Sequence, residues 1–231
     1  MIVSHKHKFI FLKTQKTAGT SIEIALSKFC GPDDIITPIT PVDEKKRSEL
    51  GHRHSQNFRA SIWDYDARDI YRTLRRRKMK RKFYNHMSAK EVKELIGNDI
   101  WDNYYKFCFE RNPWDRVISE YYWRYSEDKI RPTICEFIHS SDLLLLKKRG
   151  YWLYTIDGQI SVDKIYRFEN LAGALDEIKK ILKLPEKPVL PHAKSGFRKD
   201  KRSYRDILRQ SEQAKIGEIF SDEIRLLGYE F

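Results

Sequence analysis

Residues 9–21 read FIFLKTQKTAGTS, an order of residue types that predicts a buried strand, a tight loop and the start of a helix. The apolar run Phe9–Leu12 is rich in β-forming side chains and suits a strand covered on both faces, as in parallel sheets. From Thr20 onward apolar side chains recur with helical spacing, until Gly31 and Pro32 stop the helix. Because a helix start offers unpaired N–H groups and a positive dipole end, the loop between strand and helix is a candidate phosphate cradle.

The same order of elements recurs further along the chain. Residues 104–109 predict a second buried strand, and Asn112 and Pro113 provide an N-cap and a first-turn proline for a helix that runs to Arg124. Residues 160–168 predict another strand, followed by a helix that Asn170 caps. Strands that alternate with helices predict an α/β fold, a three-layer parallel sheet flanked by helices, in which ligands gather at the carboxyl ends of the strands.

The remaining segments give weaker signals. Ser88 and Glu91 form a capping box for a helix that ends at Gly97. Residues 63–71 favour a helix, residues 203–227 predict a helical region with breaks, and residues 32–59 read as a long irregular connection without sustained periodicity. Long loops in compact domains are often functional.

Length and composition restrict the class of protein. A chain of 231 residues is predicted to form one domain, residues 1–231, and its net charge of +12 favours anionic partners. The three cysteines Cys30, Cys108 and Cys135 are widely spaced and suggest neither a disulfide framework nor a zinc site. No apolar run approaches a membrane span, and the N-terminal one is too short for a signal sequence, so we expect a cytoplasmic protein.

The loop at residues 15–21 has the parts that an anion site needs. Gly19 allows the backbone to approach a ligand closely, and Lys16 brings a mobile point charge. The hydroxyls of Thr17, Thr20 and Ser21 can donate hydrogen bonds. The loop is not a Walker A motif, because its lysine precedes the glycine, and this weakens an ATPase or kinase interpretation.

Two segments together carry a resemblance to a known family. Residues 15–21 resemble the 5′-phosphosulfate loop, P-K-T-G/A-G/S-T-S, of the Golgi-type and bacterial carbohydrate sulfotransferases, with Gln15 in place of the usual proline. Residues 107–122 resemble the 3′-phosphate segment of the same family, in which Arg111 and Ser119 match the pair of phosphate ligands. Residues 166–171 and the closing residues 227–231 resemble two further family patterns.

The resemblance implies a P-loop-like sulfotransferase fold that binds 3′-phosphoadenosine 5′-phosphosulfate (PAPS). The implied reaction is in-line transfer of the sulfuryl group to an acceptor hydroxyl, on a carbohydrate and possibly an acidic one, which leaves 3′,5′-adenosine bisphosphate. No metal is required where cationic side chains stabilise the charge that develops. The implied donor-binding residues are Lys16, Thr17, Ala18, Gly19, Thr20, Ser21, Arg111 and Ser119.

A base must also take the proton of the acceptor hydroxyl, and neutral histidine suits this role near pH 7. His86 is the first candidate because it precedes a capped helix start, whose positive end disfavours the imidazolium form. It also resembles the family histidine that stands before a Ser-Ala helix start. His52 and His54 are runners-up, His192 is a candidate contact to donor or acceptor, and Glu23 and Glu110 are weaker alternatives.

The basic segments do not identify the acceptor. The run Arg75–Lys82 can be a solvated face, a grip for an anionic acceptor or a nucleic-acid site, and its position before His86 favours the acceptor. Segments 32–60 and 72–86 are the expected acceptor contacts. A late loop contains further candidate donor ligands, namely Lys194, Arg198, Lys199, Lys201 and Arg202.

Two other classes of function compete with this interpretation. An ATP-dependent P-loop phosphotransferase lacks support because the Walker lysine and a clear magnesium-binding acidic strand end are missing. A nucleic-acid-binding module would use the positive charge and the 13% of aromatic residues. The strongest signals nevertheless lie at strand–loop–helix junctions and not on a basic helix or an aromatic sheet, so we expect no nucleic acid.

Overall fold

The computed structural model describes the chain except for residues 62, 64, 77, 78, 129, 192–199 and 201. Its centre is a five-stranded sheet in the order β3-β1-β2-β4-β7. In chain order these strands are β1 (Ile2–Ser4), β2 (Phe9–Phe11), β3 (Ile35–Ile36), β4 (Tyr105–Glu110) and β7 (Lys164–Arg167).

The predicted α/β architecture is confirmed, with a sheet that is mixed. β4 pairs in parallel with β2 and with β7. β1 is antiparallel to both β2 and β3, which the sequence analysis did not predict. For β1 and β2 the reason is the short connection from Ser4 to Phe9, which is long enough for a hairpin but not for the crossover that parallel strands need.

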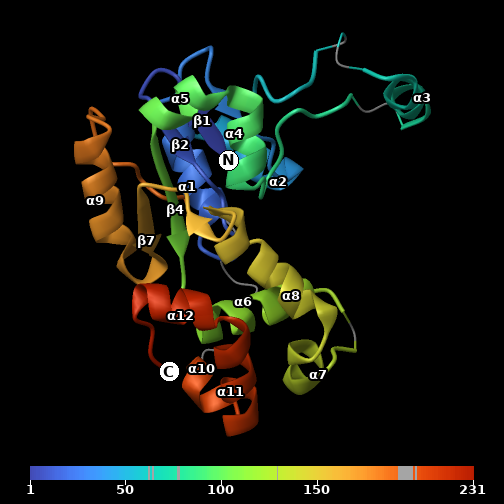
Figure 1. Ribbon diagram of the computed structural model, residues 1–231, viewed down its shortest axis with the longest axis vertical. Helices are drawn as coiled ribbons and strands as arrows, with labels where there is room; N and C mark the ends of the chain where they lie inside the picture. The colour runs from blue at the N-terminus through green and yellow to red at the C-terminus, as the bar shows by residue number, and fades with distance from the viewer. Residues whose placement is uncertain (62, 64, 77–78, 129, 192–199, 201) are drawn as a thin grey trace.

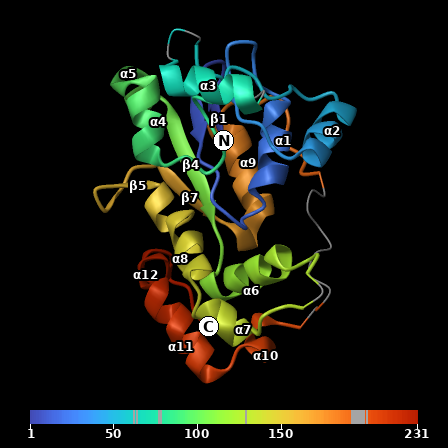
Figure 2. The same cartoon turned by 90° about the vertical axis from the view of Figure 1, so that its right-hand side faces the viewer.

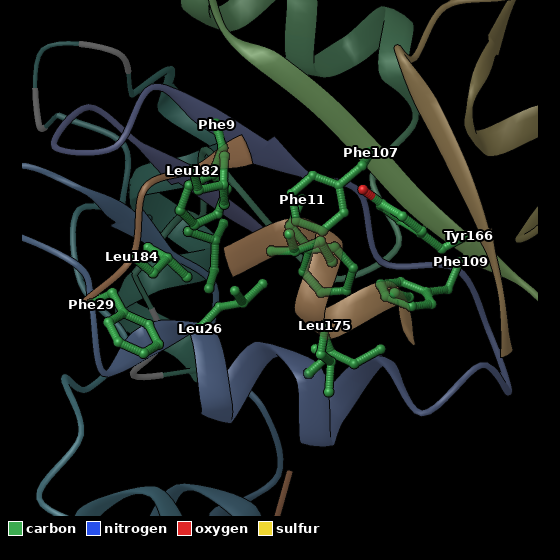
Figure 3. Packing of buried hydrophobic residues seen from close by; sticks show 14 of the residues in the cluster. Phe9, Phe11, Leu26, Phe29, Phe107, Phe109, Tyr166, Leu175, Leu182 and Leu184 are labelled. Carbon is green, nitrogen blue, oxygen red and sulfur yellow. The ribbon is translucent and has the colours of Figure 1, made fainter. Parts of the chain in front are cut away.

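Alternating side chains of the strands form two cores, one on each face of the sheet. Phe9, Phe11, Phe107 and Phe109 pack on one face against α1 (Gly19–Ser27) and α9 (Leu171–Ile181), as Figure 3 shows. The other face carries Ile10, Leu12 and Cys108, which pack with side chains of α4 (Ala89–Ile96) and with Trp101 of α5 (Asn98–Asn103). These layers confirm the predicted three-layer arrangement (Figures 1 and 2).

A group of helices lies beyond the carboxyl end of β4 (Figure 1). Trp114 and Tyr121 of the first of these helices are buried in a third core, together with Phe137, Leu143 and Ile216. The helices are α6 (Pro113–Arg124), α7 (Ile134–Ile138), α8 (Ser141–Lys148), α10 (Tyr204–Ile207), α11 (Gln210–Ile219) and α12 (Ser221–Leu227). Between α8 and β7 lie the short helix η2 (Tyr151–Leu153) and the hairpin β5 (Thr155–Ile156) and β6 (Gln159–Ile160); η3 (Phe168–Asn170) leads from β7 into α9.

Several predicted boundaries differ from the structure. The connection 32–59 contains a helix, α2 (Pro41–Glu49), capped by the Thr40 side chain. It was missed because, apart from Asp43 and Arg47, its side chains stay partly or fully exposed, so it shows no apolar periodicity. α3 (Ala67–Arg76) begins later than the predicted helix at 63–71. The strand predicted at 160–168 divides into β6 and β7.

Local capping signals are confirmed. The Ser88–Glu91 capping box is present at the start of α4, and the Asn112 side chain accepts hydrogen bonds from the N–H groups of Trp114 and Asp115.

All three cysteines are free. Within the described residues, no helix combines the length and the apolar character needed to cross a membrane.

Candidate functional site

A cavity of about 310 Å³ lies where β2 and β4 end and the following loops begin. Its walls come from the loop after β2, the start of α1, the residue after β4, the middle and last turn of α6, the segments before α2 and α4, and residues near η2 and η3. The lining residues are Lys13, Thr14, Gln15, Lys16, Ala18, Gly19, Thr20, Ser21, Ile39, Thr40, Asn85, His86, Arg111, Ser119, Trp123, Arg149 and Phe168.

The loop between β2 and α1 has an unusual backbone. Lys16 and Ala18 both adopt the left-handed conformation, with φ of 66° and 59°. Such conformations cost free energy for residues other than glycine and persist where the surroundings hold them. Gly19 is required for another reason, because a Cβ there would lie 2.8 Å from Cγ of Lys13 and 3.3 Å from the Thr14 carbonyl oxygen.

Buried side chains from other elements hold this loop in place. The Arg116 guanidinium of α6 donates to the Gln15 carbonyl (2.9 Å), to Glu110 (3.0 Å) and to the Leu146 carbonyl (3.0 Å). The Gln15 N–H donates to the Arg149 carbonyl at 2.9 Å. These contacts fasten the loop to β4, α6 and the end of α8.

Gln15 stands where the family pattern has proline, and its side chain makes two contacts that proline cannot make. Its amide nitrogen donates to Glu120 of α6 (2.9 Å), and its amide oxygen accepts from Arg149 (3.3 Å). Glu120 is also paired with Arg124 at 3.1 Å. The substitution therefore adds a polar connection between the loop and two neighbouring helices.

The start of α1 opens into the cavity through Gly19, Thr20 and Ser21. The N-cap residue, Ala18, makes no side-chain hydrogen bond to this helix start, and the first residues of the helix line the cavity, so its first N–H groups and its positive dipole end border the cavity. Thr17 does not line the cavity; it is buried, and its hydroxyl lies 2.8 Å from that of Thr14. The hydroxyl of Thr17 thus helps to shape the loop.

Arg111 and Ser119 form a second part of the wall. Arg111 leaves β4, and its guanidinium stacks 4.2 Å from the ring centre of Phe168 and donates to Asp115 (2.6 and 2.9 Å). It also donates to the Lys16 carbonyl at 3.3 Å, so the two parts of the wall are connected. Ser119 lies on α6, the helix that follows β4 and has Asn112 as its N-cap.

Trp123 extends this wall by one helical turn. It follows Ser119 by four residues on α6, a spacing that puts the two side chains on one helix face. The Lys16 ammonium lies 4.9 Å from the centre of the Trp123 ring. This cation–π contact orients the Lys16 side chain towards α6.

His86 is held in one orientation. Its Nδ1 lies 2.8 Å from the Lys13 carbonyl, which can only accept, so Nδ1 carries the hydrogen and Nε2 remains an acceptor. Burial, and after it the positive charge of Lys13, lowers the pKa of His86 from 6.5 to about 3. The ring is therefore neutral at pH 7. The residue also adopts the left-handed conformation, with φ of 60°.

Glu23 and Glu110, the weaker candidates for a base, lie outside the cavity lining. Burial raises the pKa of Glu23, but Lys13, the N-terminal ammonium and Arg47 outweigh it and lower the pKa to about 2. Burial raises the pKa of Glu110, which is paired with Arg116. Both carboxylates are placed to hold buried cations.

The cavity brings together predicted site residues of the loop after β2, of the β4–α6 segment and of the residues before α4, namely Lys16, Ala18, Gly19, Thr20, Ser21, His86, Arg111 and Ser119. His52 and His54 are not among its lining residues; His52 contacts the Ile24 carbonyl, and His54 is exposed. Arg202 is exposed and paired with Asp200. His192, Lys194, Arg198, Lys199 and Lys201 lie outside the described residues, as do Arg77 and Lys78 of the basic run.

Sequence reasoning missed several lining residues. Trp123 could have been found from its spacing to Ser119. Lys13 and Arg149 carry no motif that singles them out, because only the fold brings them to the cavity. Asn85 falls in the segment 72–86 that was expected to contact the acceptor, and Phe168 falls in the family pattern at residues 166–171, but neither was named as a site residue.

The charged side chains among the described lining residues are lysines and arginines. Lys13, Lys16, Arg111 and Arg149 contribute cations, and none of the described lining residues is acidic. Together with the dipole of α1, this arrangement produces a positive potential in a confined space. The cavity is suited to an anion with more than one charged group.

Comparisons with known proteins include one sequence relative and two solved structures. A chain from Archaeoglobus fulgidus described as an uncharacterized protein is 31% identical over 102 residues, which are 43% of this chain and 85% of that one. The mouse sulfotransferase SULT7A1 complexed with PAP is 13% identical, with a TM-score of 0.46 over 96% of this chain and 86% of that chain. A sulfotransferase from Alicyclobacillus acidocaldarius is 15% identical, with a TM-score of 0.43 over 97% of this chain and 96% of that chain.

The family comparison covers most of the candidate site. The model described as "Sulfotransferase family" matches residues 1–142, more than half of the chain. The matched region includes the loop after β2, His86, Arg111 and Ser119, and it ends before Arg149. This chain belongs to the sulfotransferase family.

Proposed function

We propose that this chain transfers the sulfuryl group of PAPS to an acceptor hydroxyl. Family membership supports the class of reaction. One observation supports the assignment of the donor: Lys16 and the start of α1 line the same cavity as Arg111 and Ser119. A nucleotide with anionic groups at both its 5′ and 3′ positions matches two separate anion-binding walls.

Each wall has a role in binding the donor. The α1 start, from Ala18 to Ser21, holds the 5′-phosphosulfate through backbone N–H groups and hydroxyls. Thr17 supports this loop from behind through its contact with Thr14. Arg111 and Ser119 hold the 3′-phosphate; the guanidinium is already oriented by Asp115 and Phe168 and can add bonds to phosphate oxygens.

The reaction is a displacement at sulfur. The acceptor oxygen forms a bond to sulfur, the bond from sulfur to the bridging phosphate oxygen breaks, and 3′,5′-adenosine bisphosphate leaves with the bonding electron pair. Lys16 stabilises the negative charge that develops on the leaving oxygen. The cations of the lining stabilise the sulfuryl oxygens.

His86 is the proposed base. Its Nδ1–H is committed to the Lys13 carbonyl, so Nε2 is left to accept the proton of the acceptor hydroxyl. Because the pKa of His86 is lowered to about 3, the ring is deprotonated before the acceptor binds. The proton is drawn onto Nε2 as sulfur withdraws electrons from the attacking oxygen.

We propose a carbohydrate hydroxyl as the acceptor. The resemblance of residues 15–21 and 107–122 to carbohydrate sulfotransferases supports this class, and the net charge of +12 suits an acidic glycan. Incubation with labelled PAPS and panels of glycans, glycolipids and small hydroxyl compounds tests it. Transfer confined to the small compounds would rule out the carbohydrate assignment.

The donor assignment is tested by nucleotide binding. We expect 3′,5′-adenosine bisphosphate to bind about 10- to 100-fold more tightly than adenosine 5′-phosphate, because it alone reaches Arg111 and Ser119. This preference should collapse in Arg111→Met and fall in Ser119→Ala, while exposed Arg225→Met keeps it. Calorimetry and thermal stabilisation measure the affinities. Equal binding of the two nucleotides to the unaltered protein, or stabilisation by ATP–Mg²⁺ alone, contradicts the proposal.

A further inference from the structure

Helix α3 and the residues on either side of it form an arm, which consists of residues 58–83 apart from 62, 64, 77 and 78. Figure 1 shows α3 standing away from the sheet and its covering helices, at the end of two chain segments. Its large apolar side chains face solvent: Ile70 is 51%, Tyr71 62% and Leu74 76% exposed. Trp63, before the helix, is 95% exposed.

These apolar side chains form a stripe. Ala67, Ile70, Tyr71 and Leu74 follow the i, i+3, i+4, i+7 spacing that aligns side chains on one helix face. Elsewhere in the molecule such faces are buried, as in α1 and α9, where they pack on the sheet. The stripe of α3 is instead a contiguous apolar surface exposed to water, which in a folded protein indicates a binding surface.

The arm is also strongly basic. Residues 66–82 contain nine lysines and arginines and two aspartates. Arg68 and Arg75 lie on α3 about a quarter-turn or more from the centre of the apolar stripe, and both are exposed. The helix thus combines an exposed apolar face with flanking positive charge.

Specific contacts hold the arm in this form. At its base Arg59 and Arg81 form an antiparallel bridge, and the Ala60 N–H donates to the Lys80 carbonyl at 3.1 Å. Lys80 connects this base to the helix region, because its ammonium pairs with Asp69 at 2.6 Å and its N–H donates to the Tyr65 hydroxyl at 2.7 Å. These contacts connect α3 to described residues on both sides of it.

The chemistry of the arm favours one occupant. A second copy of this chain would bring a net charge of +12 against the same basic surface. A nucleic acid would neutralise the arginines but would leave Ile70, Leu74 and Trp63 in water. An anionic lipid surface satisfies both features, because its headgroups attract the cations while its acyl boundary receives the apolar face.

We propose that the α3 arm binds an anionic membrane surface, with the apolar stripe and Trp63 entering the interface and the arginines contacting acidic headgroups. In this arrangement the arm lies on the membrane surface and does not cross it. The proposal does not depend on the proposed transfer reaction, because it uses none of the cavity residues.

Vesicle co-sedimentation of the full chain tests the proposal. The probes are vesicles of phosphatidylcholine alone and of phosphatidylcholine with about one third phosphatidylglycerol. We expect binding to the anionic vesicles only, weakened by salt. Ile70→Ser/Leu74→Ser should reduce binding at least tenfold, and Arg68→Gln/Arg75→Gln about fivefold for each charge removed.

Matched controls separate the arm from the general surface. Leu144→Ser/Val189→Ser removes two exposed apolar side chains elsewhere, and Lys45→Gln/Lys90→Gln removes two exposed cations elsewhere. The apolar control should bind vesicles as the unaltered chain does, and the charge control should lose less than the arginine pair. A blue shift of tryptophan emission on vesicle binding should shrink in Trp63→Phe, which reports entry of this side chain into the interface.

Three results overturn the proposal. The first is an absence of binding to anionic vesicles. The second is vesicle binding that survives Ile70→Ser/Leu74→Ser, which indicates a purely electrostatic surface of the kind that a nucleic acid uses. The third is self-association of the chain that this double variant abolishes, which assigns the stripe to a second copy.

Discussion

The loop between β2 and α1 and the α3 arm are both connections, yet their surroundings differ completely. The loop is fastened by Arg116, Arg149 and Gln15, most of whose contacts are buried, and it lies against the core of the sheet. The α3 arm is held at its base and exposes its apolar face. A site for a small, multiply charged anion requires atoms fixed to within fractions of an ångström, whereas a fluid surface requires only a stripe of the right composition.

The difference also separates two kinds of residue within the site. Lys16 and His86 are proposed to contact the reacting groups. Arg116 touches the loop carbonyl of Gln15 and is fully buried, so it acts as a positioning residue. Substitutions of these two kinds should therefore change different measured quantities.

The largest expected effect is on turnover in Lys16→Ala. Loss of the cation at the leaving oxygen should lower kcat about 10²- to 10³-fold, with a smaller change in the affinity for 3′,5′-adenosine bisphosphate. Turnover is measured with labelled PAPS and the acceptor found by screening. Lys45→Ala, an exposed lysine on α2, is the matched control and should keep full activity.

His86→Asn should also lower kcat, by about 10²-fold or more, because no lining histidine replaces it in the described cavity. The pKa of His86 is lowered to about 3, so its protonated form accumulates only as the pH falls through that value. The unaltered enzyme should therefore show no acid limb from this residue between about pH 5 and 8. Near-normal turnover in either variant would remove that residue from the proposed mechanism.

A smaller effect is expected where the support of the loop is changed. A Cβ on Gly150 would lie 2.3 Å from Nη1 of Arg116, so Gly150→Ala should displace the guanidinium from Gln15 and Glu110. We expect a loss of about 1–3 kcal/mol of stability and weaker binding of 3′,5′-adenosine bisphosphate. Chemical denaturation and calorimetry measure the two losses.

Gly158→Ala provides the comparison for this prediction. A Cβ there meets nothing within 4 Å, and the only penalty is the positive φ of 78°. This variant should lose about 1 kcal/mol and keep its affinity for the nucleotide. If Gly150→Ala binds the nucleotide as tightly as Gly158→Ala does, Arg116 does not position the loop.

The same contrast explains what the sequence could predict. The loop after β2 and the β4–α6 junction combine apolar runs, an N-cap and fixed spacings, so the elements follow from local pattern. The cavity residues Arg111 and Ser119 were predicted from the resemblance to sulfotransferase motifs, and Lys16 from the loop and the resemblance together. Helix α2 gave no such pattern because most of its side chains face solvent, although Thr40 and Pro41 mark its start. Arg149 reaches the cavity only through tertiary packing, which no local spacing encodes.

The smallest expected effect belongs to the α3 arm. Leu74→Ala should change the free energy of unfolding by no more than about 0.5 kcal/mol, because the side chain is already exposed and leaves no cavity. Leu26→Ala, the same substitution in the core between α1 and the sheet, should cost about 2–5 kcal/mol. Urea denaturation of the two variants measures the difference. A large loss at Leu74 would show that its apolar face packs against the chain itself, and would leave the α3 arm without a surface to offer a membrane.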